Sequence, residues 1–155
     1  MIAKMFSGNY ILCVAAFAWI AAQALKTLIN YIIVGKFDAE RLFGAGGMPS
    51  SHSALVCSMV IACAKVVGVH SPIFAIAFLL AGIVMYDAMG VRRETGNQAK
   101  ILNKILLDWM NDDNPDNNFL PNGKKLKELV GHTPFEVLGG ALLGILIGVL
   151  IPLPM

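Results

Sequence analysis

Four apolar segments divide this chain of 155 residues and constrain its fold more than any other feature. They cover residues 10–34, 53–69, 72–90 and 134–152. Each falls within the roughly 17–25 residues that a helix needs to cross a bilayer. The chain is 57% hydrophobic and 14% charged, which is too apolar for a water-soluble domain of this size. The sequence therefore predicts a single all-α membrane domain, an integral bundle of about four transmembrane helices.

The region between the third and fourth segments is more polar and contains one amphipathic stretch. Within residues 98–110, apolar side chains recur at helical spacing, and Lys100, Lys104 and Asp108 occupy the opposite face. A helix of this length is too short to cross the bilayer, so we expect it to lie in the membrane interface. Residues 111–131 are predicted to form a solvated polar loop.

The polar residues do not indicate a metal, a cofactor or a nucleic acid. Asp112, Asn114 and Asp116 alternate as in a calcium loop, but the glycine and the terminal glutamate of an EF-hand are missing. The net charge is only +2, and basic and aromatic residues do not gather in a block. We expect no metal, no cofactor and no nucleic-acid partner.

The first apolar segment carries a lysine well inside it. Lys26 either reaches along the surface to water or faces the interior of the bundle, because a charge in contact with lipid is costly. Residues 22–24 also have the small-x-small pattern of a signal-peptide cleavage site. Apolar residues resume at 28–34, which favours a membrane anchor over that alternative.

A glycine-rich turn at residues 46–53 leads through Pro49 into the second apolar segment. Ser50 and Ser51 are suited to helix capping, and His52 lies in the first turn. The first N–H groups of a helix have no partner within it and sit at the positive end of the helix dipole, so they can bind an anion such as phosphate. Ordinary capping is the alternative explanation for this motif.

Hairpin folding of the second and third segments would bring distant polar residues to one side of the membrane. The third segment returns Asp87 and Arg92 to the side of His52, and the fourth segment starts there with His132. A carboxylate without a partner would be costly at this depth. The candidate partners of Asp87 are Lys26, Arg41 and Arg92. A structural ion pair is the alternative to a catalytic role for Asp87.

Positive charge accumulates on this same side. Of the 12 lysines and arginines, all except Lys4 and Lys65 are expected there. Basic residues in short loops stay in the cytoplasm, so this face should be cytoplasmic and both termini should lie outside. The alternative explanation is that these basic residues only set the orientation of the protein in the membrane and bind no phosphate. The two histidines on this face, however, supply what phosphoryl transfer needs beyond cations, namely a nucleophilic imidazole and a second group that carries a proton.

Three parts of the chain together resemble a known family. Residues 46–53 resemble the P-S-G-H motif of the type 2 phosphatidic acid phosphatase and haloperoxidase superfamily. Residues 86–92 (Tyr-Asp-Ala-Met-Gly-Val-Arg) and 126–134 (Leu-Lys-Glu-Leu-Val-Gly-His-Thr-Pro) look like its small divergent bacterial and plant branch. The resemblance covers about residues 23–148.

This resemblance implies a set of roles. His132 would be the nucleophile and His52 the general acid, with Glu136 standing where the superfamily has the aspartate that orients the nucleophile. Asp87 is a further candidate catalytic residue on this face. The candidate phosphate ligands are Lys26, Arg41, Ser50, Ser51, Arg92 and Lys127.

The sequence departs from the superfamily pattern at several points. Ser51 stands where the motif has glycine, and Leu126 stands where an arginine would precede His132. The basic motif that normally precedes the serine motif is also missing. Glu136 has an alternative role too, because Thr133 and Glu136 fit a helix capping box.

The sequence therefore predicts a metal-independent membrane lipid phosphatase that cleaves a phosphomonoester or diphosphate of a phospholipid or polyprenyl lipid through a phosphohistidine. We expect it in the bacterial plasma membrane, with its site on the cytoplasmic side. A non-catalytic binder or carrier of lipid phosphates and a purely structural membrane subunit are the alternatives. Gly140, Gly144 and Gly148 recur on one face of the last segment and would permit close packing, within the bundle or in a homodimer.

Overall fold

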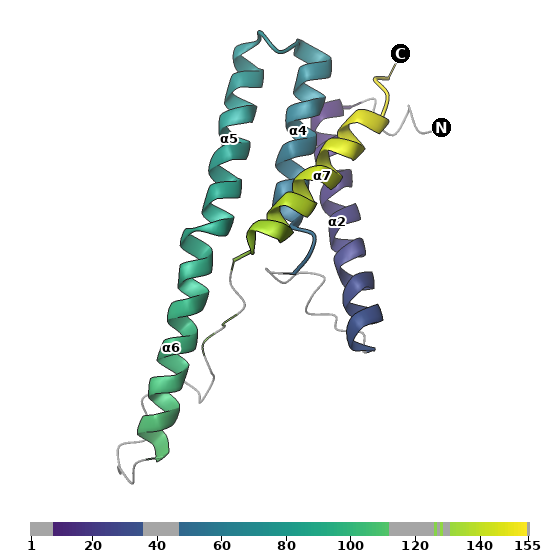
Figure 1. Cartoon of the computed structure of the whole chain (residues 1–155). Coiled ribbons are helices and arrows are strands. Elements are labelled where there is room, and N and C mark those ends of the chain that lie inside the picture. The colour runs from purple at the N-terminus through teal and green to yellow at the C-terminus, as the bar shows by residue number, and fades with distance from the viewer. Residues whose placement is uncertain (1–7, 36–46, 112–125, 127, 129–130, 155) are drawn as a thin grey trace.

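The computed structural model describes residues 8–35, 47–111, 126, 128 and 131–154. In this part of the chain all regular elements are α-helices, as predicted. They are α2 (Tyr10–Val34), α4 (Ser51–Val67), α5 (Pro72–Met89), α6 (Val91–Asn111) and α7 (Pro134–Leu150). Figure 1 shows α2, α4 and α7 packed together, with α5 beside α4 and α6 extending beyond the end of the bundle.

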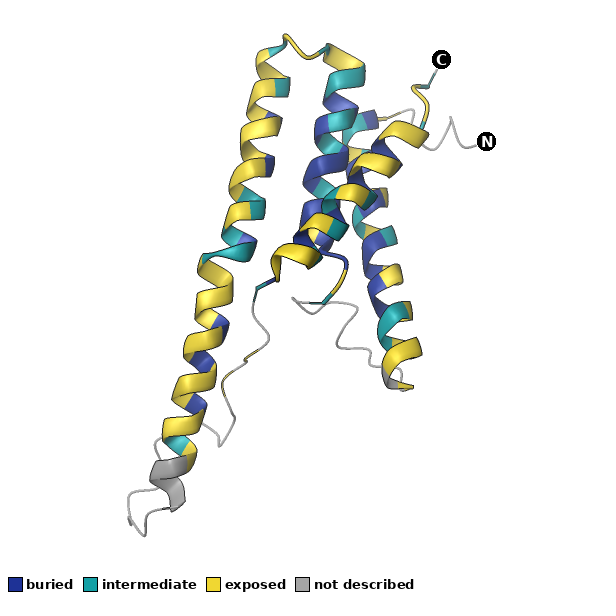
Figure 2. Ribbon diagram, viewed as in Figure 1, coloured by how far each residue is buried: buried dark blue, intermediate teal, exposed yellow. Residues whose placement is uncertain are grey.

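The helices have the lengths and surfaces of a membrane bundle. Tyr10–Ile33 and Pro72–Leu107 are long and apolar enough to cross a bilayer, and Ser51–Val67 and Pro134–Leu150 are shorter apolar helices. The outward faces of α5 and α7 expose large apolar side chains (Figure 2), which suits contact with lipid and not with water. The protein is therefore a membrane helical bundle.

The glycines of α7 allow it to lie directly against α4. A methyl group added at Gly140 would collide with the carbonyl oxygen of Ser50, and one added at Gly144 would collide with the carbonyl oxygen of Ala54. At Gly148 it would come within 2.8 Å of Ile61. The glycine face is thus occupied by α4 of the same chain, so a homodimer, which stays a prediction, would have to use another surface.

Helix α4 begins earlier than its apolar pattern suggested. Ser50 is its N-cap, and the Ser50 hydroxyl accepts a hydrogen bond from the backbone N–H of Ser53 at 3.4 Å. The helix therefore starts at Ser51, two residues before the apolar segment, as the capping serines indicated, because a serine hydroxyl can replace the missing backbone acceptor of the first turn. His52 is consequently the second residue of the helix.

The opposite end of the bundle is held by side chains that reach the end of α7. The Lys65 ammonium group donates to the carbonyl oxygens of Val149 (2.8 Å) and Ile151 (2.9 Å). The Tyr10 hydroxyl donates to the same Ile151 oxygen at 2.7 Å. These bonds satisfy carbonyls that a helix leaves unpaired at its C-terminus and join α2 and α4 to α7.

Helix α6 also starts earlier than predicted, at Val91. The Gly90 N–H donates to the Tyr86 carbonyl at the end of α5, and the Gly90 carbonyl accepts from the Glu94 N–H at 3.0 Å to begin α6. Only one residue separates the two helices, and α6 continues roughly in the direction of α5 (Figure 1). Its first turns are polar, so hydrophobic periodicity did not reveal them. Placement of α6 in the membrane interface stays a prediction.

The side chain of Asn103 ties α6 to the segment that leads into α7. Its amide group donates to the Leu126 carbonyl (2.9 Å) and to a Glu128 carboxylate oxygen (2.8 Å), and its own oxygen accepts from the Leu126 N–H (2.9 Å). Asn103 is 4% exposed, so these bonds are largely shielded from water. The calcium-like pattern at residues 112–116 lies outside the described residues.

Candidate functional site

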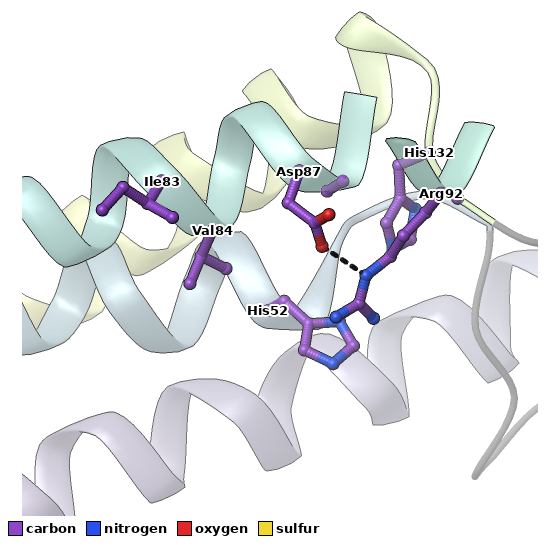
Figure 3. A pocket seen from close by; sticks show the side chains of 8 residues that line it. His52, Ile83, Val84, Asp87, Arg92 and His132 are labelled. Carbon is purple, nitrogen blue, oxygen red and sulfur yellow. Dashed lines mark hydrogen bonds and ion pairs between the residues drawn. The ribbon is translucent and has the colours of Figure 1, made fainter. Parts of the chain in front are cut away.

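Two histidines meet where the ends of several helices converge. His52 lies in the first turn of α4, and His132 lies two residues before the start of α7. Their ring centroids are 6.4 Å apart, with the ring planes at 61°. The hairpin of α4 and α5 brings Asp87 to this end, and Arg92 follows at the start of α6 (Figure 3). Residues predicted to share one face of the membrane are thus in proximity.

Backbone contacts set the position of His132. Its N–H donates to the Ala88 carbonyl near the end of α5 at 2.9 Å. Gly131 has a φ of +93°, and a Cβ there would collide with the backbone of Arg92 and Arg93. Only glycine fits this conformation and this close approach. The segment before α7 is therefore anchored to the α5–α6 junction, and His132 is 3% exposed.

Glu136 makes the contacts of both roles considered for it. Its Oε2 lies 3.0 Å from Nδ1 of His132 and accepts the backbone N–H of Thr133 at 3.1 Å. The Thr133 hydroxyl accepts the Glu136 N–H at 3.4 Å, which completes the capping box. Because a carboxylate accepts and does not donate, Nδ1 carries the hydrogen. The Nε2 lone pair of the neutral His132 ring is therefore free for chemistry.

The surroundings of His132 favour its neutral form. Burial lowers the pKa of His132 below its usual value, and the charges of Lys26 and Arg92 act in the same direction. The hydrogen bond and the charge of Glu136 oppose that shift without cancelling it. At neutral pH the imidazole is therefore uncharged, which is the form that can act as a nucleophile or a base.

Asp87 pairs with Arg92, one of the three partners considered from the sequence. Arg92 Nε lies 2.6 Å from Asp87 Oδ2, and the side chains are 49% and 37% exposed, respectively (Figure 3). This contact occupies one edge of the guanidinium fork. The terminal nitrogens make no hydrogen bond to the part of the chain that the structure describes, and they remain able to bind an oxyanion.

A cavity of about 150 Å³ lies between these groups. By the same measure a single water needs about 10–15 Å³, so the cavity has room for a larger group. Four of its lining residues have polar or charged side chains, and the other four are apolar residues or glycine. The lining residues are His52, Ile83, Val84, Asp87, Ala88, Arg92, Gly131 and His132.

The two candidate serines differ in their surroundings from the histidines. Ser50 is fully buried; its N–H donates to the Glu136 carbonyl, and its hydroxyl accepts from Ser53, so it acts as a structural cap. Ser51 is 1% exposed and does not line the cavity. The N–H groups of Ser51 and His52, at the start of α4, bond to no acceptor within the described residues. They remain available as donors to an anion.

Helix α2 contributes buried polar residues to this end of the bundle. Lys26 is 3% exposed, so it faces the interior and does not reach along the surface to water. Gln23, which the sequence alone did not mark as a site residue, is 8% exposed, and its Oε1 has no hydrogen-bond partner among the described residues. Its spacing of three residues from Lys26, on one helix face, was the available signal.

Arg41 and Lys127 lie outside the described residues. The described residues include no group of three or more His, Cys, Asp or Glu side chains that could hold a metal ion.

These features define a class, a membrane helical bundle in which two histidines lie close together at one end and a carboxylate contacts the buried one. The chain belongs to the Divergent PAP2 family, whose model matches residues 7–147. It is also similar to the uncharacterized membrane protein YuiD of Bacillus subtilis (strain 168), with 41% identity over 144 residues that cover 90% of this chain and 91% of that protein. No solved structure matches the chain significantly.

Proposed function

We propose that this protein is a membrane phosphatase that hydrolyses a lipid phosphomonoester or diphosphate through a phosphohistidine. The arrangement of Glu136, His132 and His52 is the observation that carries the proposal. His132 and His52 line one cavity, and Glu136 contacts Nδ1 of His132. These are the nucleophile, the second imidazole and the orienting group that covalent phosphoryl transfer would use. Membership of a family related to lipid phosphatases supports the same reaction.

The two rings are close enough to act on one bound group. Their centroids are 6.4 Å apart, and both imidazoles line the same cavity. A phosphoryl group bound in this cavity would have His132 as its nucleophile, and His52 would act on the leaving oxygen.

The reaction proceeds in two displacements. Nε2 of His132 attacks phosphorus, the bond from phosphorus to the ester oxygen breaks, and protonated His52 gives its proton to that oxygen, so the alcohol leaves. Water then attacks the phosphohistidine while neutral His52 takes a proton from the water. The P–N bond breaks, inorganic phosphate leaves, and both imidazoles return to their starting states.

Cations and N–H groups would bind the phosphoryl oxygens. Arg92 presents the part of its guanidinium group that Asp87 does not occupy, so Asp87 acts as a positioning residue for Arg92. The N–H groups of Ser51 and His52 contribute the positive end of the α4 dipole. Lys26 supplies a buried positive charge from α2, and Arg41 and Lys127 stay predicted ligands.

The proposed substrate is a lipid, and the proposed location is the cytoplasmic face of the bacterial plasma membrane. Ile83 lines the cavity and is itself 66% exposed on the outer surface of α5, where an acyl or prenyl chain would run. The concentration of basic residues at this end supports the cytoplasmic orientation.

The experiment is phosphate release by the full chain in lipid nanodiscs from a panel of phospholipid and polyprenyl phosphates. His132→Gln should abolish release and also abolish an acid-labile, base-stable phosphoprotein formed during turnover. His70→Gln is the matched control, because His70 lies in the turn between α4 and α5 at the other end of the bundle. Binding of these lipids without release by the wild-type protein would contradict the phosphatase and favour the carrier.

A further inference from the structure

The buried face of α2 changes from apolar to polar along the helix. Tyr10, Val14, Ala18 and Ala22 form its buried apolar part. Gln23, Lys26 and Thr27 continue it, and each is less than one tenth exposed. In a membrane bundle, polar groups directed inward are costly unless they have partners, and they commonly mark functional sites.

The polar part of α2 lies level with the start of α4. Tyr10 and Val14 pack against Ala62, and α2 and α4 run antiparallel (Figure 1). Both helices rise about 1.5 Å per residue. Position 12 of α2, midway between Tyr10 and Val14, is therefore level with Ala62 of α4. The same number of residues separates position 12 from Gln23 as separates Ala62 from Ser51, so Gln23 is level with Ser51. Gln23 therefore lies at the depth of the His52 turn.

The oxygen of Gln23 lacks a donor. Its Oε1 is buried and has no hydrogen-bond partner in the part of the chain that the structure describes. The neighbouring hydroxyl of Thr27 does not supply one, because it donates to the backbone carbonyl of Gln23 at 2.9 Å. A buried acceptor left without a donor is unfavourable, and in native proteins such a group calls for an explanation.

The donors near the two histidines indicate what kind of ligand the site would hold. Lys26, Arg92 and the first N–H groups of α4 are donors, which match the acceptor oxygens of a phosphate group. The Gln23 oxygen is an acceptor, so it would not favour a fully ionised phosphate. In a phosphate ester, the group that can donate to this oxygen is an O–H group.

We propose that Gln23 determines the specificity of the site by accepting a hydrogen bond from a hydroxyl group of the bound phosphate ester. This inference rests on the proposed function, because it takes the ligand to be a phosphate ester at the two histidines. The hydroxyl belongs either to the alcohol part of the ester or to a singly protonated phosphate group, whose second pKa is about 6.

The test is a comparison of two lipids that differ by one hydroxyl. Lysophosphatidic acid carries a free hydroxyl beside its phosphate ester, and its 2-deoxy analogue lacks that group. Dissociation constants are measured for the full chain with His132→Gln, which prevents turnover, at pH 5 and at pH 8. Gln23→Met is the variant that removes the acceptor, and Thr27→Val is its matched control.

If the alcohol supplies the donor, the protein with Gln23 should bind lysophosphatidic acid about tenfold more tightly than the deoxy analogue at both pH values. Gln23→Met should remove this preference, and Thr27→Val should keep it. If the phosphate supplies the donor, both lipids should bind more tightly at pH 5, and Gln23→Met should remove that gain. Gln23→Glu, which keeps acceptor oxygens in the same shape, guards against loss through misfolding and should retain the preference.

A preference that is unchanged in Gln23→Met, or a protein with Gln23 that shows neither preference, would overturn the role of Gln23. The outcome is separable from the proposed function because binding is the readout. A hydroxyl preference that depends on Gln23, found together with no phosphate release by the wild-type protein, would support this inference and reject the phosphatase.

Discussion

Oε2 of Glu136 lies 3.0 Å from Nδ1 of His132, and the same oxygen caps α7. The orientation of the proposed nucleophile is thereby fixed to the start of a transmembrane helix. We predict that Glu136→Gln lowers kcat by about 10²–10⁴-fold, because the amide no longer holds the Nδ1 tautomer as a carboxylate does. Phosphate release by the reconstituted protein measures the effect.

Thr133→Ala separates the two roles of Glu136. It removes the hydroxyl that accepts the Glu136 N–H, which should cost about 0.5–2 kcal/mol of stability. It leaves the contact between Glu136 and His132 in place. Melting temperature should therefore fall while most of the activity remains, and an equal loss of activity in both variants would contradict a specific role for the carboxylate.

The pH dependence follows from the direction of the His132 shift. Its pKa is lowered in the folded protein, so the neutral nucleophile persists below the ordinary value of about 6.5. Activity limited by His132 should rise with pH along an acid limb whose midpoint lies below 6.5. Glu136→Gln should move that midpoint further down, because Glu136 raises the pKa. A pH–rate profile of kcat/KM measures both.

Stability should show the matching effect. Because His132 binds protons less readily when folded, its contribution to stability is fully present above the unfolded pKa of about 6.5 and is reduced as the pH falls below it. The loss of melting temperature between pH 7.5 and pH 5 should therefore be smaller in His132→Gln than in the wild-type protein. An identical loss would contradict the lowered pKa.

Arg92 is expected to bind the transferring phosphoryl group with the nitrogens that Asp87 leaves open. Arg92→Lys should lower kcat/KM and weaken inhibition by vanadate by about tenfold or more, since lysine offers a point charge in place of a planar fork. Arg93→Lys is the matched control, because Arg93 is the exposed neighbour and does not line the cavity. Equal effects of the two substitutions would contradict this assignment.

Asn103 should affect activity from a distance. Asn103→Ala removes three hydrogen bonds that hold the segment before His132 against α6. We predict a loss of kcat with a smaller change in KM. Asn97→Ala is the control, because Asn97 is exposed on the same helix and makes one long contact to Glu94. Comparable kinetics in the two variants would show that the segment is held by other contacts.

The packing of α7 on α4 gives a prediction about stability alone. Gly144→Ala places a methyl group against the Ala54 backbone, so it should destabilise the bundle by about 1–3 kcal/mol. Gly82→Ala, where nothing lies within 4 Å of the added methyl group, should be neutral or stabilising. Thermal unfolding in detergent compares the two, and an unchanged oligomeric state in Gly144→Ala would agree with packing within one chain.

Local patterns in the sequence were sufficient for the helical architecture. Runs of apolar residues predicted the helices, Thr133 and Pro134 predicted where α7 starts, and the hairpin placed His52 and His132 on one side. These features depend on residues a few positions apart, or on the alternation of direction between successive spans. The capping serines also indicated that His52 lies in the first turn of α4. The early start of α6 was missed, because its polar first turns carry no hydrophobic period.

Tertiary structure alone decided which groups are partners. Sequence left Asp87 with three possible cations and Glu136 with two possible roles. Only packing selected Arg92, and only packing showed that one oxygen of Glu136 contacts both His132 and the Thr133 N–H. It also turned the α7 glycines toward α4, and within the described part of the chain it left the Gln23 oxygen without a donor. The physical reason is the distance along the chain over which each interaction acts. Helix formation depends on residues that are neighbours in sequence. A hydrogen bond between helices depends on ångström-scale distances that the packing of the whole bundle sets.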